Sequence, residues 1–250
     1  MIMIGQRIVT AALSASAFML VWQVIVWIGD FKPFLLPGPV RVIEALIFNR
    51  VVIVENAVVT MVEIFIGLIA GLGFGVLTAI QLAMSPLARR HVRPALVLLQ
   101  AIPFFALAPI LTYWLGFGMA PKIVMAMIII YFPVTSAFFD GLMRTPPGYL
   151  DLARTMGAGR WRTLWLVRIP AAAPALATAL RLGAVFTPIG AVIGEWVGGS
   201  GGGLGYLMLL ANGRVKIDLM FACVAVLALL TVLLYALADW IGRWLVSRTT

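Results

Sequence analysis

Long apolar runs constrain this chain more than any other feature of its sequence. A bilayer core about 30 Å thick is crossed by a helix of roughly 20 apolar residues. Six runs approach that length, near residues 8–28, 58–80, 94–114, 121–141, 171–195 and 218–242. Hydrophobic residues make up 63% of the 250 residues and charged residues 11%, too few polar groups to cover a soluble globule. We therefore expect an all-α integral membrane protein with six transmembrane helices, forming a single domain over residues 1–250.

The basic residues predict the orientation of these helices. A formal net charge of +9 raises the question of a nucleic-acid partner, but basic residues of membrane proteins gather in cytoplasmic loops, so their positions decide. With the amino terminus inside, Arg89–Arg93 and Arg144–Arg168 are cytoplasmic, and the inner segments hold more Lys and Arg than the outer ones. We expect no nucleic-acid partner, both termini in the cytoplasm, and Lys32–Arg50 and Gly198–Lys216 outside.

The segment Arg144–Pro174 is a polar and basic island between two apolar runs. Pro146 and Pro147 favour a helix start, because proline lacks the N–H that the first helical turn leaves unpaired. Ala153 and Gly157 lie four residues apart, hence on one helical face, where their small size would let a partner's backbone approach closely. The pattern predicts a short cytoplasmic helix that contacts another protein.

This segment also resembles a known motif. Asp151–Ala153, three residues, Gly157, nine residues and Val167–Pro170 are similar to the cytoplasmic "EAA" loop of permease subunits in bacterial ATP-binding-cassette importers. That family's pattern is Glu-Ala-Ala, three residues, Gly, nine residues, Ile, any residue, Leu-Pro. The chain departs from it at Asp151, Leu152, Val167 and Ile169, of which Leu152 is the least conservative change.

The resemblance implies a type I importer permease fold in the bacterial inner membrane, with a coupling helix in the loop of about residues 142–170. It implies a second permease subunit, identical in our expectation, together with two cytoplasmic ATP-binding subunits and an external substrate-binding protein. ATP and Mg would be bound by those partner subunits, with no cofactor in this chain. The residues that it assigns to ATPase coupling are Asp151, Leu152, Ala153, Met156, Gly157, Ala158 and Pro170.

Polar and helix-breaking residues within the apolar runs are candidates for the translocation pathway. They are Gln100, Pro103, Phe104, Tyr131, Arg181, Thr187 and Glu195. A charge at membrane depth marks a pathway or a buried pair, and we expect one of these roles for Arg181. The alternative is that its side chain extends along the lipid to the cytoplasmic surface. Glu195 would line the mouth of the pathway or be solvated, and Glu63 would lie at the outer interface.

Three further patterns predict structural features. Gly67, Gly71 and Gly75 clear one face of the second run for close helix packing, within the chain or in a dimer. The glycine-rich stretch Gly198–Tyr206 fits no phosphate-binding pattern and is predicted as a flexible outer segment, similar to a passage that follows the fifth helix in these permeases. The amphipathic pattern at Val42, Ile43, Leu46 and Ile47 predicts an outer loop leading into a helix on the membrane surface.

Enzyme chemistry is not indicated. One histidine (His91), one cysteine (Cys223) and dispersed carboxylates do not form a catalytic or metal-binding set. The alternatives to a permease are a channel or secondary transporter, and a membrane scaffold or intramembrane enzyme. A secondary transporter would show inverted repeats and acids at mid-membrane, neither of which is evident.

The cargo is predicted mainly from resemblance. Gly205–Arg214 and Ile217–Ala222 look like the closing segment of permeases for aminopyrimidine precursors of thiamine, so a hydroxymethylpyrimidine-like solute is our first expectation. The same architecture serves nitrate, alkanesulfonate and taurine, which stay open as alternatives. The candidate pathway residues are aromatic and neutral apart from Arg181 and Glu195, which suits a flat, weakly charged heterocycle.

Overall fold

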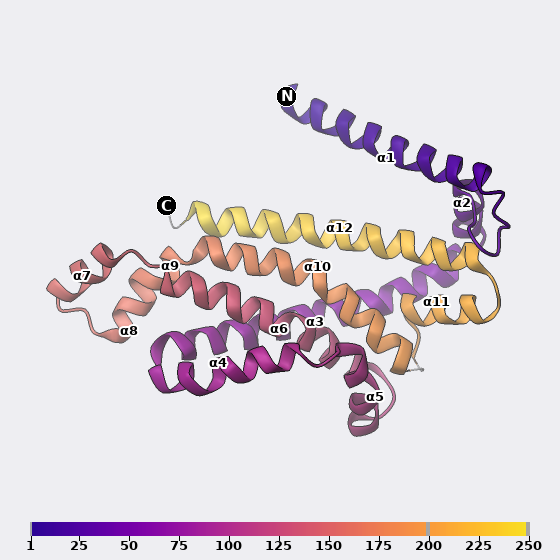
Figure 1. The fold of residues 1–250 in the computed structure, drawn as a ribbon. Helices are drawn as coiled ribbons and strands as arrows, with labels where there is room; N and C mark the ends of the chain where they lie inside the picture. The colour runs from indigo at the N-terminus through magenta and orange to yellow at the C-terminus, as the bar shows by residue number, and fades with distance from the viewer. Residues whose placement is uncertain (1, 199–200, 249–250) are drawn as a thin grey trace.

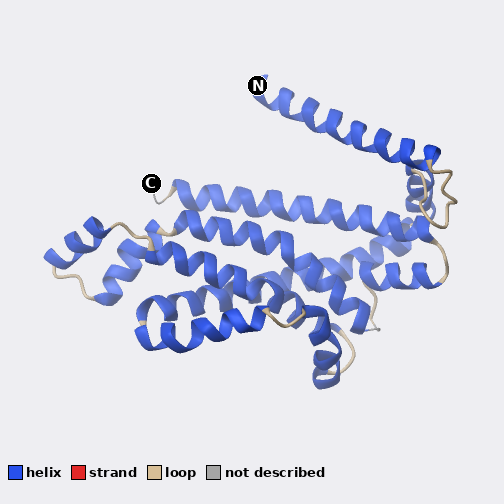
Figure 2. Ribbon diagram, viewed as in Figure 1, coloured by secondary structure: helices blue, strands red, loops and turns tan. Residues whose placement is uncertain are grey.

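A computed structural model describes residues 2–198 and 201–248, which form helices joined by short turns and contain no strand (Figure 2). The elements in chain order are α1 (Ile2–Ile28), α2 (Pro39–Phe48), α3 (Arg50–Met84), α4 (Pro86–Gln100), α5 (Phe104–Leu115), α6 (Met119–Met143), α7 (Pro147–Thr155), α8 (Arg160–Thr163), the π-helical turn η1 (Leu164–Arg168), α9 (Ile169–Ala171), α10 (Ala173–Gly198), α11 (Leu204–Gly213) and α12 (Ile217–Ser247). The all-α prediction is confirmed.

Four helices of the described chain, α3, α6, α10 and α12, are long and apolar enough to cross a membrane. They run side by side in Figure 1. The third expected run is present as two helices, α4 and α5, which meet at a bend of 100° next to Pro103 and together amount to at most a fifth span. The first run falls in α1, a helix of 27 residues. By length and composition, four described helices qualify as spans, or five if the bent pair counts as one.

Helix α6 lies at the centre of the bundle, between α3 and α10. The glycine row of α3 packs on it with a constant register: Gly67 against Ala126, Gly71 against Ile130, and Gly75 against Val134. A Cβ added at any of the three would lie 2.5–2.7 Å from those side chains, too close for a real contact. The row is thus a contact within the chain, one of the two alternatives expected from its spacing.

The other side of α6 is packed just as closely by α10. A Cβ at Gly190 would lie 2.6 Å from the Ala126 backbone, and one at Gly194 would lie 2.7 Å from that of Lys122. Side chains on either flank would therefore push the helices apart. Glycines on α3 and α10 hold α6 in place from both sides.

The short helices gather at the two ends of the bundle. In Figure 1, α7, α8 and α9 lie at one end, α2 and α11 lie at the other, and α1 stands away from the rest beyond α2. The helix predicted from Val42, Ile43, Leu46 and Ile47 is present as α2, and Val42 and Ala45 are buried in a cluster with residues of α11 and α12. One side of α2 therefore packs on protein, while Ile43, Ile47 and Phe48 stay exposed, so the location of α2 at the membrane surface stays a prediction.

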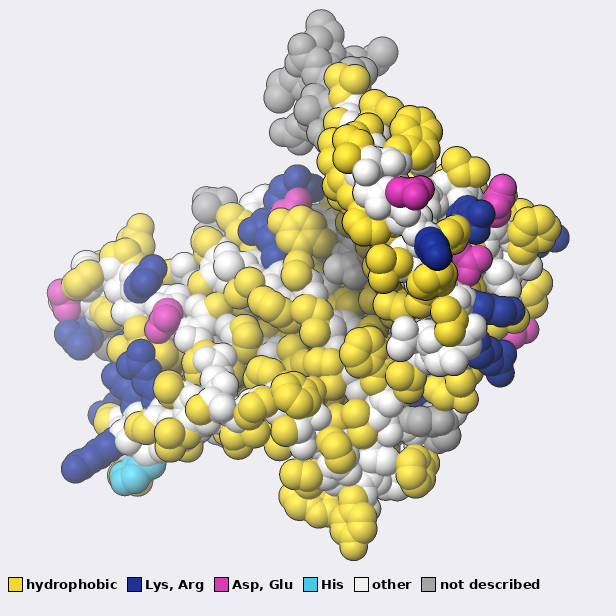
Figure 3. All heavy atoms as spheres, turned by 45° about the vertical axis from the view of Figure 1, so that its right-hand side comes forward, with side chains coloured by type: hydrophobic (Ala, Val, Ile, Leu, Met, Phe, Trp, Pro, Cys, Tyr) yellow, Lys and Arg dark blue, Asp and Glu magenta, His cyan; other side chains and the backbone are white. Residues whose placement is uncertain are grey.

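The surface is consistent with a lipid environment around the bundle. Large hydrophobic side chains on the long helices face outward, including Ile69, Phe74, Leu229 and Val232. Figure 3 shows hydrophobic side chains across the middle of one face, with Lys and Arg gathered toward its ends. This distribution is that of a membrane protein, in which lipid covers the apolar belt.

Candidate functional site

Helix α7 begins at Pro147, as the proline pair predicted, and Gly157 defines how it ends. Gly157 has a left-handed φ of +72°. Its N–H donates to the Arg154 carbonyl at 2.9 Å, and the Ala158 N–H donates to the Ala153 carbonyl at 2.9 Å. These two bonds form a Schellman motif, in which glycine follows the last helical turn. Gly157 therefore lies beyond the helix, and the prediction that it shares a helical face with Ala153 is wrong.

The two sides of α7 have different surroundings. Ala153 is 7% exposed and packs within the chain, so it does not offer a partner the open surface expected of it. Tyr149, Leu152 and Met156 are 59%, 58% and 78% exposed, and their spacing places them on one face. Asp151 forms an exposed ion pair of 2.9 Å with Arg154. The outward face of α7 is thus apolar with a charged flank.

Pro170 shapes the return from α8 to α10. Before it, the Ile169 N–H bonds to the carbonyl of Leu164, the wider spacing that makes η1 a π turn. Leu164 is fully buried and packs with Leu142 and Ala172 in a cluster at this end of the bundle. Pro170 is half-buried behind this turn and does not belong to the outward face of α7.

Three of the candidate pathway residues meet at one pocket. Gln100, Phe104 and Tyr131 line a hollow of about 340 Å³ between α3, α4, α5 and α6. Its other lining residues are Phe74, Leu99, Leu107, Met127, Ile128 and Phe132. The Tyr131 hydroxyl is hydrogen-bonded to that of Thr78 at 3.0 Å. Pro103 caps α5 at the adjacent bend.

The remaining pathway candidates lie elsewhere. Arg181 forms an ion pair of 2.8 Å with Asp239 of α12, and the two side chains are 31% and 25% exposed. Arg181 therefore takes the paired role rather than extending alone to the surface. Thr187 is fully buried, and its hydroxyl donates to the Gly183 carbonyl of its own helix. Assigning Thr187 to the lining of a passage is thus wrong for this structure, because no part of its side chain is accessible.

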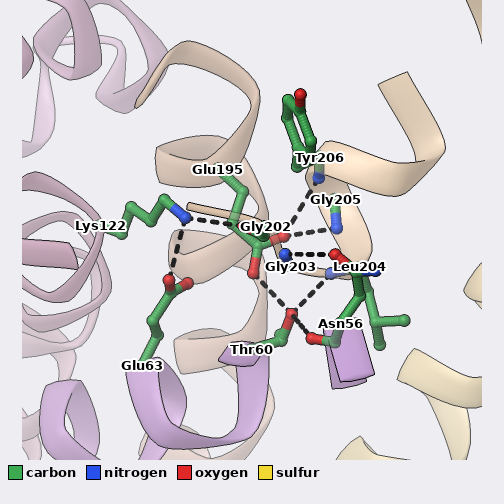
Figure 4. A network of polar contacts seen from close by, with 10 residues as sticks. All are labelled: Asn56, Thr60, Glu63, Lys122, Glu195, Gly202, Gly203, Leu204, Gly205 and Tyr206. Carbon is green, nitrogen blue, oxygen red and sulfur yellow. Dashed lines mark hydrogen bonds and ion pairs between the residues drawn. The ribbon is translucent and has the colours of Figure 1, made fainter. Parts of the chain in front are cut away.

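Glu195 lies near the end of α10, which is far from α7 in Figure 1, and is the centre of a buried polar network (Figure 4). It is 0% exposed. Its carboxylate accepts a 2.6 Å hydrogen bond from the Thr60 hydroxyl and further bonds from the backbone N–H groups of Gly205 and Tyr206. Both alternatives expected for Glu195, a solvated group and one lining the pathway mouth, are therefore wrong here, since the carboxylate is turned into the protein.

Side chains of α3 complete the same network. The Thr60 hydroxyl oxygen accepts from the Leu204 N–H, and the Asn56 side-chain oxygen accepts from the Gly203 N–H, each at 2.8 Å. The N–H groups that open α11, which a helix leaves unpaired, are thus bonded to residues of α3 and α10. Residues 201–206 are consequently held in place, and the prediction of a flexible segment is wrong for them; residues 199–200 lie outside the described residues.

Lys122 and Glu63 extend this network across α6. The two side chains are 1% and 0% exposed, and their charged atoms are 3.1 Å apart. Lys122 also donates to the Gly202 carbonyl at 2.8 Å. Glu63 was expected at the outer interface; the structure buries it against Lys122, a partner that the sequence did not identify. The signal available from sequence was a charge in or beside an apolar run, which is costly without a partner.

The arrangement of long apolar helices and a helical loop at one end agrees with comparisons to known proteins. Residues 71–250 match the family described as the binding-protein-dependent transport system inner membrane component. The chain belongs to this family. It is therefore a multi-pass inner-membrane permease subunit of an ATP-binding-cassette importer, as the EAA-like loop predicted.

Relatives and solved structures support this assignment. The permease is 44% identical to a probable ABC transporter permease of Haemophilus influenzae, covering 94% of this chain and 96% of the relative. It is 31% identical to the formylaminopyrimidine transport permease ThiX of Halalkalibacterium halodurans, over 87% of each chain. Its fold is similar to that of the inward-facing MetNI methionine ABC transporter, with a TM-score of 0.60 and 24% identity over 75% of this chain and 91% of the other. The type I importer fold is thereby confirmed.

Proposed function

We propose that this permease forms the membrane passage of an ATP-driven importer for a small solute. Two copies of the chain would enclose the passage, two cytoplasmic ATP-binding subunits would bind ATP and Mg and hydrolyse the nucleotide, and an external protein would deliver the solute. Family membership supports the partner subunits. The proposed contact site for the ATP-binding subunit is the outward apolar face of α7. It is supported by the exposure of Tyr149, Leu152 and Met156.

Within this proposal the coupling residues divide into two groups. Asp151, Leu152 and Met156 face outward and would touch the ATP-binding subunit. Ala153, Gly157, Ala158 and Pro170 shape the loop that presents them. ATP binding would shift α7, and η1 and α9 would pass this shift to α10, which is continuous from Ala173 to Gly198 and carries Glu195 near its far end. The passage would then alternate between inward-open and outward-open states.

We further propose a neutral aminopyrimidine as the solute, with the pocket at Gln100, Phe104 and Tyr131 on its route. The pocket is lined by aromatic and apolar side chains with one amide and one phenol, and none of its lining residues is charged. Such a surface stacks on a flat heterocycle better than it neutralises an anion. The similarity to ThiX supports the same class, whereas 28% identity to the taurine permease TauC of Escherichia coli keeps a sulfonate as the second candidate.

The test is uptake into vesicles that contain the complete importer, with ATP inside and the binding protein outside. Labelled hydroxymethylpyrimidine, formylaminopyrimidine, taurine and nitrate are compared. We expect ATP-dependent uptake of a pyrimidine, reduced by Tyr131→Phe or Gln100→Leu. Uptake of taurine or nitrate without any pyrimidine would overturn the choice of solute, and ATP-independent uptake of any of them would overturn the coupling to ATPase subunits.

A further inference from the structure

A second hollow, separate from the pocket at Tyr131, lies between the α3–α4 junction and the loop that carries α7. Its volume is about 440 Å³. The residues that line it are Ala83, Met84, Pro86, Arg89, Leu150, Arg154, Ala158, Arg160, Thr163 and Arg168. Four arginines from four different elements, α4, α7, α8 and η1, therefore meet around one cavity, which we call the arginine cavity.

The charge of this cavity is not neutralised within the chain. No Asp or Glu is among its described lining residues. Arg154 pairs with Asp151, which is itself largely exposed. Across residues 2–198 and 201–248, no ion pair involves Arg89, Arg160 or Arg168. Like charges across a gap repel each other, so the walls lack a counter-charge that would hold them together.

Some guanidinium groups are already positioned by other contacts. Arg89 donates through Nε to the Leu82 carbonyl at 3.1 Å and through Nη2 to the Ala83 carbonyl at 3.4 Å, at the end of α3. This fixes the side chain while leaving its other N–H groups available. Arg168 has a single described side-chain contact, 3.9 Å to the sulfur of Met143. The guanidinium groups of Arg89 and Arg168 are thus positioned at the cavity, and N–H groups of both remain available to a ligand.

We propose that the arginine cavity binds a phosphate-bearing anion, either the head group of an anionic phospholipid or a soluble phosphate compound of the cytoplasm. Guanidinium groups match phosphate oxygens in geometry and form short, charge-assisted hydrogen bonds with them. Thr163 offers a hydroxyl donor, and Met84 and Leu150 form an apolar part of the wall. Exposed Trp161 and Trp165 on α8 and η1 are typical of the head-group level of a bilayer, which is where a lipid would be captured.

Such an anion would hold the α7 loop against the end of α3 and the start of α4. This consequence rests on the proposed function, because it matters for transport only if α7 contacts the ATP-binding subunit. The binding itself does not rest on it and is measured without transport.

The test uses the complete importer in nanodiscs of phosphatidylcholine, with phosphatidylglycerol added in one arm and inorganic phosphate titrated in the other. Native mass spectrometry counts retained phosphatidylglycerol, and thermal unfolding reports stabilisation by phosphate. The test variant is Arg160→Gln with Arg168→Gln. The matched control is Arg90→Gln with Arg162→Gln, which removes the same charge from exposed positions of α4 and α8 outside the cavity.

We expect one probe to bind the native importer and to bind the test variant about tenfold or more weakly, with the control unchanged, because each lost guanidinium removes charge-assisted bonds. Without either probe, the test variant should unfold at the same or a higher temperature, since it relieves repulsion. Retained phosphatidylglycerol identifies a lipid head group, and stabilisation by phosphate alone identifies a soluble anion. Binding of neither probe, equal weakening in the control, or loss of ATP-binding subunits from the test variant without any change in probe binding would overturn the proposal.

Discussion

The hydroxyl of Thr60 donates to the carboxylate of Glu195 at 2.6 Å, joining α3 to α10 across 135 positions of sequence. Both side chains are completely buried. The same hydroxyl oxygen accepts the backbone N–H of Leu204, so one atom connects three helices. A contact of this kind fixes the start of α11 relative to the two helices that pack on α6.

Removing this hydroxyl should destabilise the permease. Thr60→Val keeps the side-chain volume but leaves the Leu204 N–H unpaired in a buried site, which costs about 1–3 kcal/mol. Thr60→Ser restores the hydroxyl and should recover most of the stability. Thermal unfolding of the assembled importer measures both. Thr231→Val is the control, because the described bond of Thr231 is to the Leu227 carbonyl of its own helix; equal effects of Thr60→Val and Thr60→Ser would contradict the role of the hydroxyl.

The Glu63–Lys122 pair gives a second prediction. Lys122→Met should strongly reduce the yield of folded protein, since breaking a buried ion pair from one side costs about 3–5 kcal/mol. Adding Glu63→Gln to that variant should restore part of the loss, because the uncompensated charge is removed. Lys122 also donates to Gly202, so the recovery stays incomplete. Folded yield from the membrane fraction measures both, and a double variant no better than Lys122→Met would show that the pair is not the cause.

Local features of the fold could be predicted from the sequence, and long-range ones could not. Apolar length predicted helices α3, α6, α10 and α12, and the proline pair predicted the start of α7, since each signal lies within the segment it describes. The glycine row predicted a close contact but not its partner. Pro103 indicated a possible break in the third run, but its bend could not be predicted, because a proline within a membrane run is compatible with either a straight or a broken helix.

The candidate site shows the same division. Glu63 was assigned to the outer interface from sequence, but its burial depends on its contact with Lys122 of another helix. The hydrogen bond between Thr60 and Glu195 could not be predicted without knowing that α3 and α10 flank α6. Gly157 was placed on a helical face from a spacing of four, whereas its left-handed φ places it after the helix. Spacing predicts a face only while the helix continues.

Gly157 itself is open to a direct test. A Cβ there meets nothing within 4 Å, so a side chain is disfavoured by backbone conformation and not by crowding in this chain. Gly157→Asn should retain assembly and uptake, because Asn adopts the left-handed region readily. Gly157→Leu should reduce both, with a conformational cost of about 1–2 kcal/mol. Co-purification with the ATP-binding subunit and vesicle uptake measure the two effects; if Asn fails as badly as Leu, crowding against a partner is the better explanation.

The outward face of α7 gives the last prediction. Leu152→Ser with Met156→Ser should weaken association with the ATP-binding subunit and lower uptake, because the two side chains are 58% and 78% exposed and would be covered by that subunit. The fold of the permease should persist, since neither side chain is buried in its own chain. Thr155→Ala, an exposed change on the same helix that keeps both Leu152 and Met156, is the control. Association is measured by co-purification, and coupling by the ATP hydrolysis that the external binding protein stimulates. Normal association and uptake in the double variant would place the ATPase contact on another surface and exclude this face of α7 as the coupling element.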